Sequence, residues 1–244
     1  MQLIRIFQII NFKLKKMKKL VFIMSLMSSV FLTAQTMVFT VQELKVKPFT
    51  QNDIASAFDD VFDGVKMNQA GVVLERFRKG SSNGMTHRLV FMSTLGVDMV
   101  DEDAISDDKN AVFWGKLRNY VEEWGSGYSG RILSWQEAEL EGNKNIHIWD
   151  IKVEDQNSFK EGHDKIIKEF KSDFDGRVVG FGTYDIGRPN GATHWIVLSG
   201  KNTNDHLMLY DKLQKQNKFL KLIEERGSFE DVKDYELQIL RRKQ

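Results

Sequence analysis

Apolar and polar positions alternate along eight stretches of this chain, which is the pattern of β-strands that bury at least one face. The expected strands span residues 37–47, 72–79, 86–94, 131–136, 145–154, 178–186, 193–199 and 235–240. Between them, apolar residues recur at spacings of three and four, as on one side of a helix. The stripes are Phe58, Val61, Phe62 and Val65; Trp114, Leu117, Tyr120, Val121 and Trp124; and Ile166, Ile167, Phe170 and Phe174. The pattern therefore predicts a chain of mixed strands and helices.

Local signals place the ends of these helices. Thr50 with Asp53 is an N-terminal capping pattern, and Phe49 and Ile54 have the spacing of a hydrophobic staple. Ser158 and Glu161 have the spacing of a capping box. Gly125 can end the helix that contains Trp124.

The chain also matches itself at a shift of 107 positions. Residues 43–46 (Glu-Leu-Lys-Val) correspond to residues 150–153 (Asp-Ile-Lys-Val), and residues 80–87, which end in Asn-Gly-Met-Thr-His, correspond to residues 187–194, which end in Asn-Gly-Ala-Thr-His. Two matching blocks at one shift are much less expected by chance than one. Each Asn-Gly pair predicts a type I′ turn in a tight hairpin, because both positions of that turn need positive φ angles.

Each half reads as strand, helix, strand, hairpin, strand, helix, strand, which is the ferredoxin-like order. The fold class expected is α+β, with one ferredoxin-like βαββαβ repeat in residues 35–140 and a second in residues 141–244, both with antiparallel sheets. Phe39 and Val41 point to the face opposite Leu44 and Val46, so both faces of the sheet are expected to be covered.

This tandem arrangement resembles the dimeric α+β barrel superfamily, fused here into one chain. The resemblance implies two packed sheets with helices outside, and a monomer with an internal pseudo-two-fold axis rather than an obligate dimer. It also implies a choice of activities. Members of this superfamily include cofactor-independent monooxygenases, in which the substrate itself activates dioxygen, and haem-binding chlorite dismutases and dye-decolorising peroxidases.

The charge of the chain is unevenly distributed. Six of its 35 basic residues and none of its 34 acidic residues lie in residues 1–34, so the remainder has 29 basic and 34 acidic residues, a net charge of −5. Such a surface repels phosphate backbones unless it carries a local basic patch. The sequence shows no such patch, and no nucleic-acid partner is expected.

The basic start has the form of a leader for export. From Met17, the expected start, Lys18 and Lys19 precede an apolar core at residues 20–32, and Ala34 is suited to cleavage. Residues 1–34 are therefore interpreted as an upstream extension and a signal peptide, and the mature protein as periplasmic or extracellular. The alternative is an uncleaved leader that anchors the protein in a membrane, because residues 20–42 carry no charge.

Histidines are the first candidates for chemistry, since the chain has no cysteine for disulfides, thiolate metal sites or nucleophilic catalysis. His87 and His194 each follow the Asn-Gly turn at the start of a strand. With an ordinary pKa of about 6.5, either can act as a general base near neutral pH. The alternative is that both only bond a nearby loop.

A ligand is expected to be small and aromatic or apolar. Its candidate binding residues are Trp149, Tyr184, His147 and Trp195, which differ from their counterparts at the 107-residue shift. Strand alternation places His147 and Trp149 on one face and Trp195 opposite His194, so these residues cannot all line one cavity. Packing in the core is the alternative interpretation.

Other polar residues favour structural roles. The five histidines form no pair four residues apart, and the acidic stretch 98–108 lacks the regular spacing of a calcium loop, so no metal is expected. Glu43 and Asp150 recur by the repeat; they are either an acid and a base or, as the pattern favours, ion-pair partners of Lys45, Lys152 or arginines.

Three functions remain open from the sequence. The first is an exported barrel that binds a small aromatic or apolar molecule without a cofactor; if it is an enzyme, cofactor-independent oxygenation is the reaction expected. The second is a non-catalytic structural or partner-binding module. The third is a haem-binding barrel, which needs a histidine ligand.

Overall fold

The computed structural model describes residues 35–101, 104–138 and 141–244, and Thr36–Gln244 form one compact body. The strands are β1 (Met37–Val46), β2 (Gly71–Lys79), β3 (His87–Thr94), β4 (Val121–Gln136), β5 (Asn145–Val153), β6 (Val179–Thr183), β7 (His194–Gly200) and β8 (Phe229–Lys243). The α-helices are α2 (Gln51–Phe62), α3 (Asp107–Tyr120), α4 (Gln156–Glu169), α5 (Thr203–Gln214) and α6 (Asn217–Glu225), with a 3₁₀ turn at Pro189–Gly191. The expected leader, from its start at Met17 through the apolar core 20–32 to Ala34, lies outside the described residues.

Within the described residues, every helix is too short or too polar to span a membrane.

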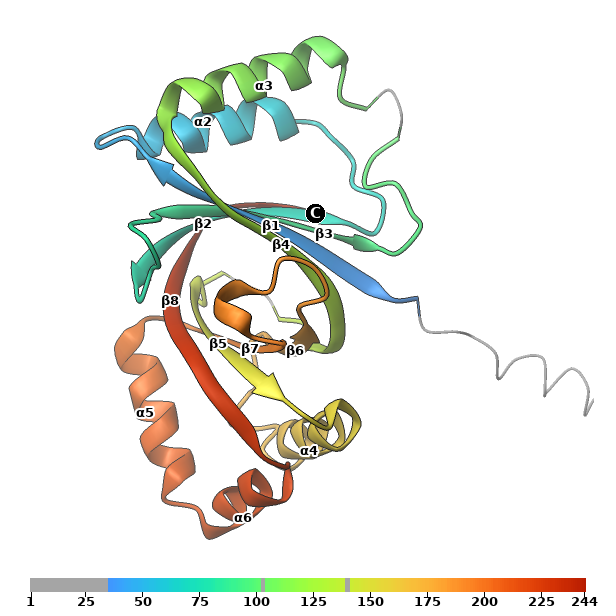
Figure 1. Cartoon of the computed structure of the whole chain (residues 1–244), viewed down its shortest axis with the longest axis vertical. Helices are drawn as coiled ribbons and strands as arrows, with labels where there is room; N and C mark the ends of the chain where they lie inside the picture. The colour runs from blue at the N-terminus through green and yellow to red at the C-terminus, as the bar shows by residue number, and fades with distance from the viewer. Residues whose placement is uncertain (1–34, 102–103, 139–140) are drawn as a thin grey trace, which may run out of the picture. The chain divides into compact units, whose positions relative to one another are not determined.

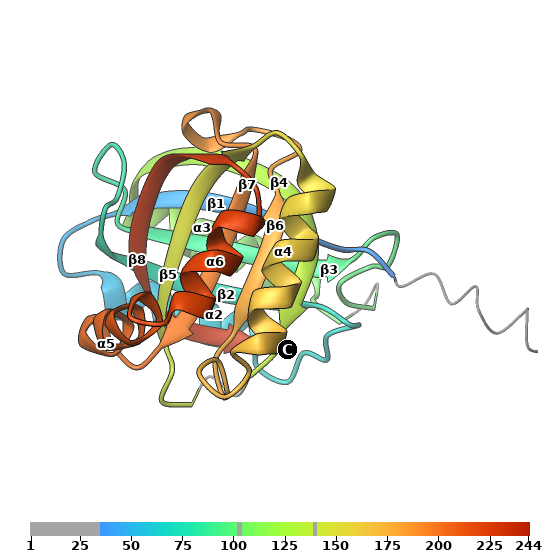
Figure 2. The same ribbon diagram turned by 90° about the horizontal axis from the view of Figure 1, so that it is seen from below.

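The eight strands close into one antiparallel barrel in the order β1-β3-β2-β8-β5-β7-β6-β4. Helices α2 and α3 cover the barrel over the strands of the first half, and α4, α5 and α6 cover it over the strands of the second half (Figure 1). Seen from below, α4 and α6 lie across the strands of the second half (Figure 2). The α+β class and the arrangement of a closed barrel with helices outside are confirmed.

Strand pairing has the same register in the two halves of the chain. In the first half Leu44 pairs with His87, and in the second half Ile151 pairs with His194. Val41 likewise pairs with Tyr128, and Ile148 with Tyr235. Each pair of the second half lies 107 positions after its counterpart.

Both faces of the strands are buried. One apolar cluster takes residues from strands all round the barrel, for example Phe39, Val90, Ile148 and Leu237, and therefore fills the interior. Separate clusters pack on the outer face, against α2 and α3 on one side and against α4, α5 and α6 on the other. The expectation that both faces are covered is confirmed.

The two Asn-Gly pairs adopt the expected backbone angles. Asn83 and Gly84 have φ angles of 51° and 73°, and Met85 N donates to Ser82 O at 3.0 Å. The prediction of a tight hairpin is nevertheless wrong. Strand β2 ends at Lys79 and β3 begins at His87, so the turn lies inside a longer loop.

The helix predicted through Trp124 ends earlier than expected. Helix α3 stops at Tyr120, and Val121 and Trp124 already belong to β4, so Gly125 does not terminate a helix. The physical reason is the partner strand, since β1 pairs with β4 along its whole length, from Met37 to Val46. Cross-strand hydrogen bonds to β1 thus override the local helical pattern. Strand β8 is also longer than predicted.

The predicted caps are wrong in detail. Phe49 is 95% exposed with a φ of 68°, so it cannot staple against the buried Ile54. Thr50 is the N-cap residue of α2 as predicted, but its side chain donates to Lys47 O at 2.9 Å and bonds no helical N–H. Helix α4 is capped by Asp155, which accepts from the backbone of Asn157 and Ser158, and not by the Ser158 box.

Candidate functional site in the barrel interior

One end of the barrel interior holds a group of polar and aromatic side chains. This end carries the loops 80–86 and 187–193, and polar and aromatic side chains face inward there beside aliphatic ones. We call this group the interior cluster: Glu75, Arg88, Tyr128, Asp150, Tyr184, Trp195 and Tyr235, all buried, with Glu43 half-buried at its edge. These side chains lie close together because alternation along each strand points every second side chain into the barrel.

The interior cluster contains a buried ion pair. Glu75 and Arg88 are directly opposite each other on β2 and β3, are both 5% exposed, and are joined from Arg88 Nε to Glu75 Oε2. Arg88 also donates to the hydroxyls of Tyr235 at 3.2 Å and Tyr128 at 3.4 Å. Burial lowers the pKa of Arg88, but the charge of Glu75 outweighs it and keeps the guanidinium protonated. Such a pair rarely gains more than its desolvation costs.

Asp150 is a buried carboxyl of the interior cluster. It is 2% exposed, and the Tyr184 hydroxyl donates to its Oδ1 at 2.7 Å. Burial raises the pKa of Asp150 to about 6, although the Tyr184 bond and the charge of Arg88 oppose the rise. Burial also raises the pKa of Tyr128 to about 12, so the tyrosines stay neutral donors. A carboxyl that titrates near pH 6 is suited to accept a proton at neutral pH.

Aromatic rings form the opposite side of the interior cluster. Trp195 faces Gly182 across β6 and β7, where an added Cβ at position 182 would lie 2.3 Å from the indole. Phe39 meets the Trp195 ring edge-on at 5.5 Å and the Tyr184 ring at 6.0 Å. Trp195 Nε1 is buried and has no hydrogen-bond partner among the described residues. A buried donor without a partner in a native protein calls for an explanation, such as a ligand acceptor.

The expected ion pairs of Glu43 and Asp150 with neighbouring lysines are wrong. Lys45 bonds Glu122 at 2.8 Å, and Lys152 bonds Glu230 at 2.8 Å. Glu122 and Glu230 lie on the strands next to those of the two lysines. A residue on an adjacent strand is closer to a lysine than the next residue on the same face of its own strand. Glu43 is left at the edge of the interior cluster, where burial raises its pKa.

The two candidate catalytic histidines do not face the interior. His194 stacks on Phe181 of the outer face, with ring centroids 5.3 Å apart, and its ring nitrogens lie 2.8 Å from the Thr193 hydroxyl and 3.3 Å from Gln156 Oε1. His87 also lies on the outer face, and burial lowers its pKa to about 4. Both are neutral side chains in the layer between sheet and helices.

The four candidate ligand residues are divided between the two faces. Tyr184 and Trp195 lie in the interior cluster, whereas His147 and Trp149 lie on the outer face and stack at 3.9 Å. His147 bonds the Tyr210 hydroxyl of α5 at 2.7 Å and Asp234 at 2.9 Å. The prediction that these residues cannot all line one cavity is confirmed, and their roles stay predictions.

Sequence reasoning missed most of the interior cluster. It did not single out Glu75, Arg88, Tyr128 or Tyr235. A signal was available, because Tyr128 and Tyr235 are separated by the same 107 positions as the matching blocks.

The described residues contain no group of three or more His, Asp or Glu able to hold a metal ion. All five histidines are described, and His147 and His194 have both ring nitrogens engaged. The Nε2 atoms of His87, His163 and His206 are buried without a partner in the described part of the chain. A haem would need an open slot beside one of these rings.

Comparison with known proteins shows the fold. No family model matches the sequence, and no curated protein matches it either. Among solved structures, a proposed monooxygenase from Lactobacillus acidophilus is similar at a TM-score of 0.56 and 14% identity, over 85% of this chain and 96% of that one. A proposed monooxygenase from Fusobacterium nucleatum is similar at a TM-score of 0.55 and 16% identity, over 86% and 95%. The chain has the fold of the dimeric α+β barrel superfamily, as the sequence predicted.

Proposed function

We propose that the protein binds one small aromatic molecule with an acidic hydroxyl group inside the barrel, where Asp150 accepts the hydroxyl proton. The observation that carries this proposal is the buried carboxyl of Asp150, whose pKa burial raises to about 6. A core selected only for stability would be apolar there, because buried ionisable groups cost free energy of folding. Such costs are typical of functional sites.

The other groups of the interior cluster suit the same ligand. Trp195 Nε1 lacks an acceptor among the described residues, and an oxygen of the ligand can supply one. Arg88 places a positive charge near the ring oxygen that loses its proton. The rings of Phe39 and Tyr184 offer edge and face contacts to an aromatic ligand.

Cofactor-independent oxygenation is the first reaction to test. A deprotonated aromatic hydroxyl compound is electron-rich, and in this class of chemistry the substrate itself activates dioxygen. The two similar structures are described as proposed monooxygenases, which names a reaction for the assay. Oxygen consumption in the presence of the bound aromatic compound is the measurement.

The binding experiment compares 1-naphthol with naphthalene, which has the same rings and no hydroxyl. Tryptophan fluorescence at pH 7 is expected to show saturable binding of 1-naphthol to the wild type. Asp150→Asn is expected to weaken it about tenfold, the loss of one charge-assisted hydrogen bond. His194→Phe, on the outer face, is the matched control and is expected to bind like the wild type. Equal affinity of wild type and Asp150→Asn for 1-naphthol would overturn the proposal.

A non-catalytic structural module is the second candidate. It is favoured by the aliphatic side chains, such as Val41, Val73 and Val90, that fill the interior beside the interior cluster. This candidate predicts that neither 1-naphthol nor naphthalene binds the wild type in a saturable way.

We further propose that the barrel consists of two ferredoxin-like repeats, residues 35–140 and 141–244, in a monomer. The strand orders β4-β1-β3-β2 and β8-β5-β7-β6 and the common 107-residue shift of their registers support this proposal. Sedimentation equilibrium is expected to give the mass of one chain, and a stable dimer would contradict the proposal.

The export of the protein is also proposed, on the basic start and apolar core of residues 17–34 alone. Mass spectrometry of the mature N-terminus is expected to find Gln35 first. A chain that retains Lys18 in the mature protein would contradict cleavage.

A further inference from the structure

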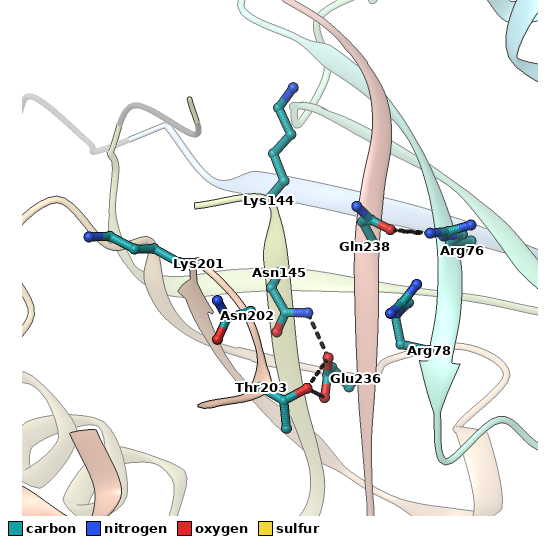
Figure 3. Close-up of a pocket in the computed structure, with 9 residues that line it drawn as sticks. All are labelled: Arg76, Arg78, Lys144, Asn145, Lys201, Asn202, Thr203, Glu236 and Gln238. Atoms are coloured by element: carbon teal, nitrogen blue, oxygen red, sulfur yellow. Dashed lines mark hydrogen bonds between the residues drawn. The ribbon is translucent and has the colours of Figure 1, made fainter. Parts of the chain in front are cut away.

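A polar pocket opens on the outside of the barrel, away from the interior cluster. It lies where β2, β8 and β5 are neighbours and where α5 begins, and its volume is about 180 Å³. Arg76 and Arg78 reach it from β2, Asn145 from β5, and Glu236 from β8 (Figure 3). We call it the seam pocket, because β2 and β8 join the two halves of the barrel there.

The one carboxylate that lines the seam pocket is already satisfied. Glu236 accepts from Lys79 at 2.6 Å, from Asn145 Nδ2 at 2.6 Å and from the Thr203 hydroxyl at 2.8 Å. Burial raises the pKa of Glu236, but these hydrogen bonds outweigh it and lower the pKa to about 2. Glu236 is therefore a fixed, neutralised anion and has little capacity for a cationic ligand.

The remaining charge of the seam pocket is positive. Arg76, Arg78, Lys144 and Lys201 line it against the single carboxylate of Glu236. Arg76 bonds Gln238 at 2.9 and 2.6 Å, whereas Arg78, Lys144 and Lys201 have no ion-pair partner in the described part of the chain. Lys144 and Lys201 extend outward from the rim (Figure 3). The sequence did not reveal this group of cations, because positions 76, 78, 144 and 201 lie far apart along the chain.

Two further features point to a ligand rather than to bare surface charge. Asn145 is 8% exposed, and its Oδ1 is buried without a partner among the described residues, while its Nδ2 is used by Glu236. The first turn of α5 also lies at the pocket, with its cap Asn202 and its first residue Thr203 in the lining. A helix N-terminus favours an anion, and a free Oδ1 requires a donor such as a hydroxyl.

The opposite seam shows that these charges are not a general property of the barrel. There β4 and β6 are neighbours, and Arg131, which lies 107 positions before Gln238, is paired with Asp185 at 2.8 and 2.9 Å. Asp185 in turn lies 107 positions after Arg78. The two seams therefore carry different charges at corresponding positions. In the described chain, Arg131 of the β4–β6 seam has an acidic partner, whereas Arg76 and Arg78 of the β2–β8 seam have none.

We propose that the seam pocket binds a small phosphomonoester that carries a free hydroxyl group. Its phosphate is bound by Arg78, by the two rim lysines and by the first turn of α5, and its hydroxyl donates to Asn145 Oδ1. A cavity of about 150 Å³ holds a benzene-sized molecule. The pocket therefore has room for a phosphate and a few further heavy atoms, as in glycerol 3-phosphate. This site is separate from the proposed function and does not depend on it.

The test is titration of the full chain with glycerol 3-phosphate, followed by calorimetry and by the NMR signals of the Asn145 side-chain amide. Inorganic phosphate and glycerol are titrated separately to measure how much the phosphate and the hydroxyl part of the ligand each contribute to the affinity. Phosphatidylcholine vesicles with and without phosphatidic acid distinguish a lipid headgroup from a soluble phosphomonoester. Arg78→Gln removes one cation, and Lys144→Gln with Lys201→Gln removes two. Arg118→Gln, on the exposed side of α3, is the control of equal charge for Arg78→Gln.

Saturable binding of glycerol 3-phosphate with a shift of the Asn145 amide is the expected result. Arg78→Gln is expected to raise the dissociation constant about tenfold, while Arg118→Gln and Asp150→Asn leave it within about twofold. Absence of saturable binding to the wild type would overturn the proposal. An equal loss of affinity in Arg78→Gln and Arg118→Gln would also overturn it, because it would indicate unspecific electrostatic attraction. Binding to phosphatidic acid vesicles alone would overturn it as well.

Discussion

Corresponding positions of the barrel interior hold different chemistry in the two halves. Glu75 pairs with Arg88 on β2 and β3, whereas Gly182 pairs with Trp195 on β6 and β7, 107 positions later in each case. One half thus places a buried ion pair where the other places an indole against a glycine. In contrast, Tyr128 and Tyr235 are the same residue type in both halves.

The difference indicates that the interior is two-sided. The ion pair and the tyrosine hydroxyls supply charge and donors, and Trp195 supplies an aromatic surface with an unused donor. Asp150, whose pKa burial raises to about 6, belongs to the same cluster. Because neither arrangement is the best way to fill a core, we interpret both as adaptations to a ligand that is aromatic on one side and acidic on the other.

Breaking the ion pair is expected to have the largest effect. Arg88→Met leaves the carboxylate of Glu75 buried without its partner, which costs about 3–5 kcal/mol of unfolding free energy. Urea unfolding at pH 7 measures this loss. The double variant Glu75→Gln with Arg88→Met removes both charges and is expected to recover most of the stability. A single variant as stable as the wild type would show that the pair is not buried as described.

Asp150→Asn is expected to stabilise the protein at neutral pH. The pKa of Asp150 is about 6 in the folded protein, against an ordinary 3.8. The unfolded chain therefore loses this proton first, and folding becomes less favourable as pH rises from about 3.8 to about 6. Above pH 6 the full penalty is about 3 kcal/mol, and below pH 3.8 it is absent.

Urea unfolding of wild type and Asp150→Asn at pH 7 and at pH 3.5 measures this difference. A gain at pH 7 that disappears in acid is the expected outcome, and the exposed Asp98→Asn variant is the control. A loss of stability of Asp150→Asn at pH 7 would contradict this prediction, because it would mean that the folded protein stabilises the Asp150 carboxylate.

Trp195→Phe tests the aromatic side of the comparison. The smaller ring loses packing against Phe39 and Gly182 but also removes a buried donor without a partner. These effects oppose each other, so stability is expected to change by less than about 1.5 kcal/mol. The affinity for 1-naphthol is expected to fall several-fold. Unchanged affinity would remove Trp195 from the ligand site.

His194→Phe is expected to have the smallest effect. Its ring stacks on Phe181 outside the barrel, and a phenyl ring keeps that contact while losing bonds to Thr193 and Gln156. The change in unfolding free energy is expected to stay below about 1 kcal/mol, with unchanged binding of 1-naphthol. A large loss of affinity would return His194 to the site that the sequence predicted.

The sequence predicts the barrel well because its signals are local or periodic. The 107-residue match and the positive φ angles of Asn83 and Gly84 depend on short segments alone. The end of α3 is less predictable, since Trp124 has helical spacing but pairs with Leu44 of β1. Long-range pairing decided that boundary.

The site is less predictable because it depends on which face of a strand points inward. Alternation separates Trp195 from His194, but it does not show that the face of Trp195 is the interior. The raised pKa of Asp150 depends on burial by several strands, and the seam pocket depends on four distant segments. Neither leaves a motif in the sequence.

The central claim is that Asp150 is a proton-accepting carboxyl in the ligand site. A ¹³C NMR titration of the Asp150 carboxyl, with and without 1-naphthol, measures it directly. We expect a midpoint near pH 6 in the free protein and a clear displacement of that midpoint when the compound is present. A midpoint near the ordinary value of 3.8, or one that 1-naphthol leaves unchanged, would contradict the claim.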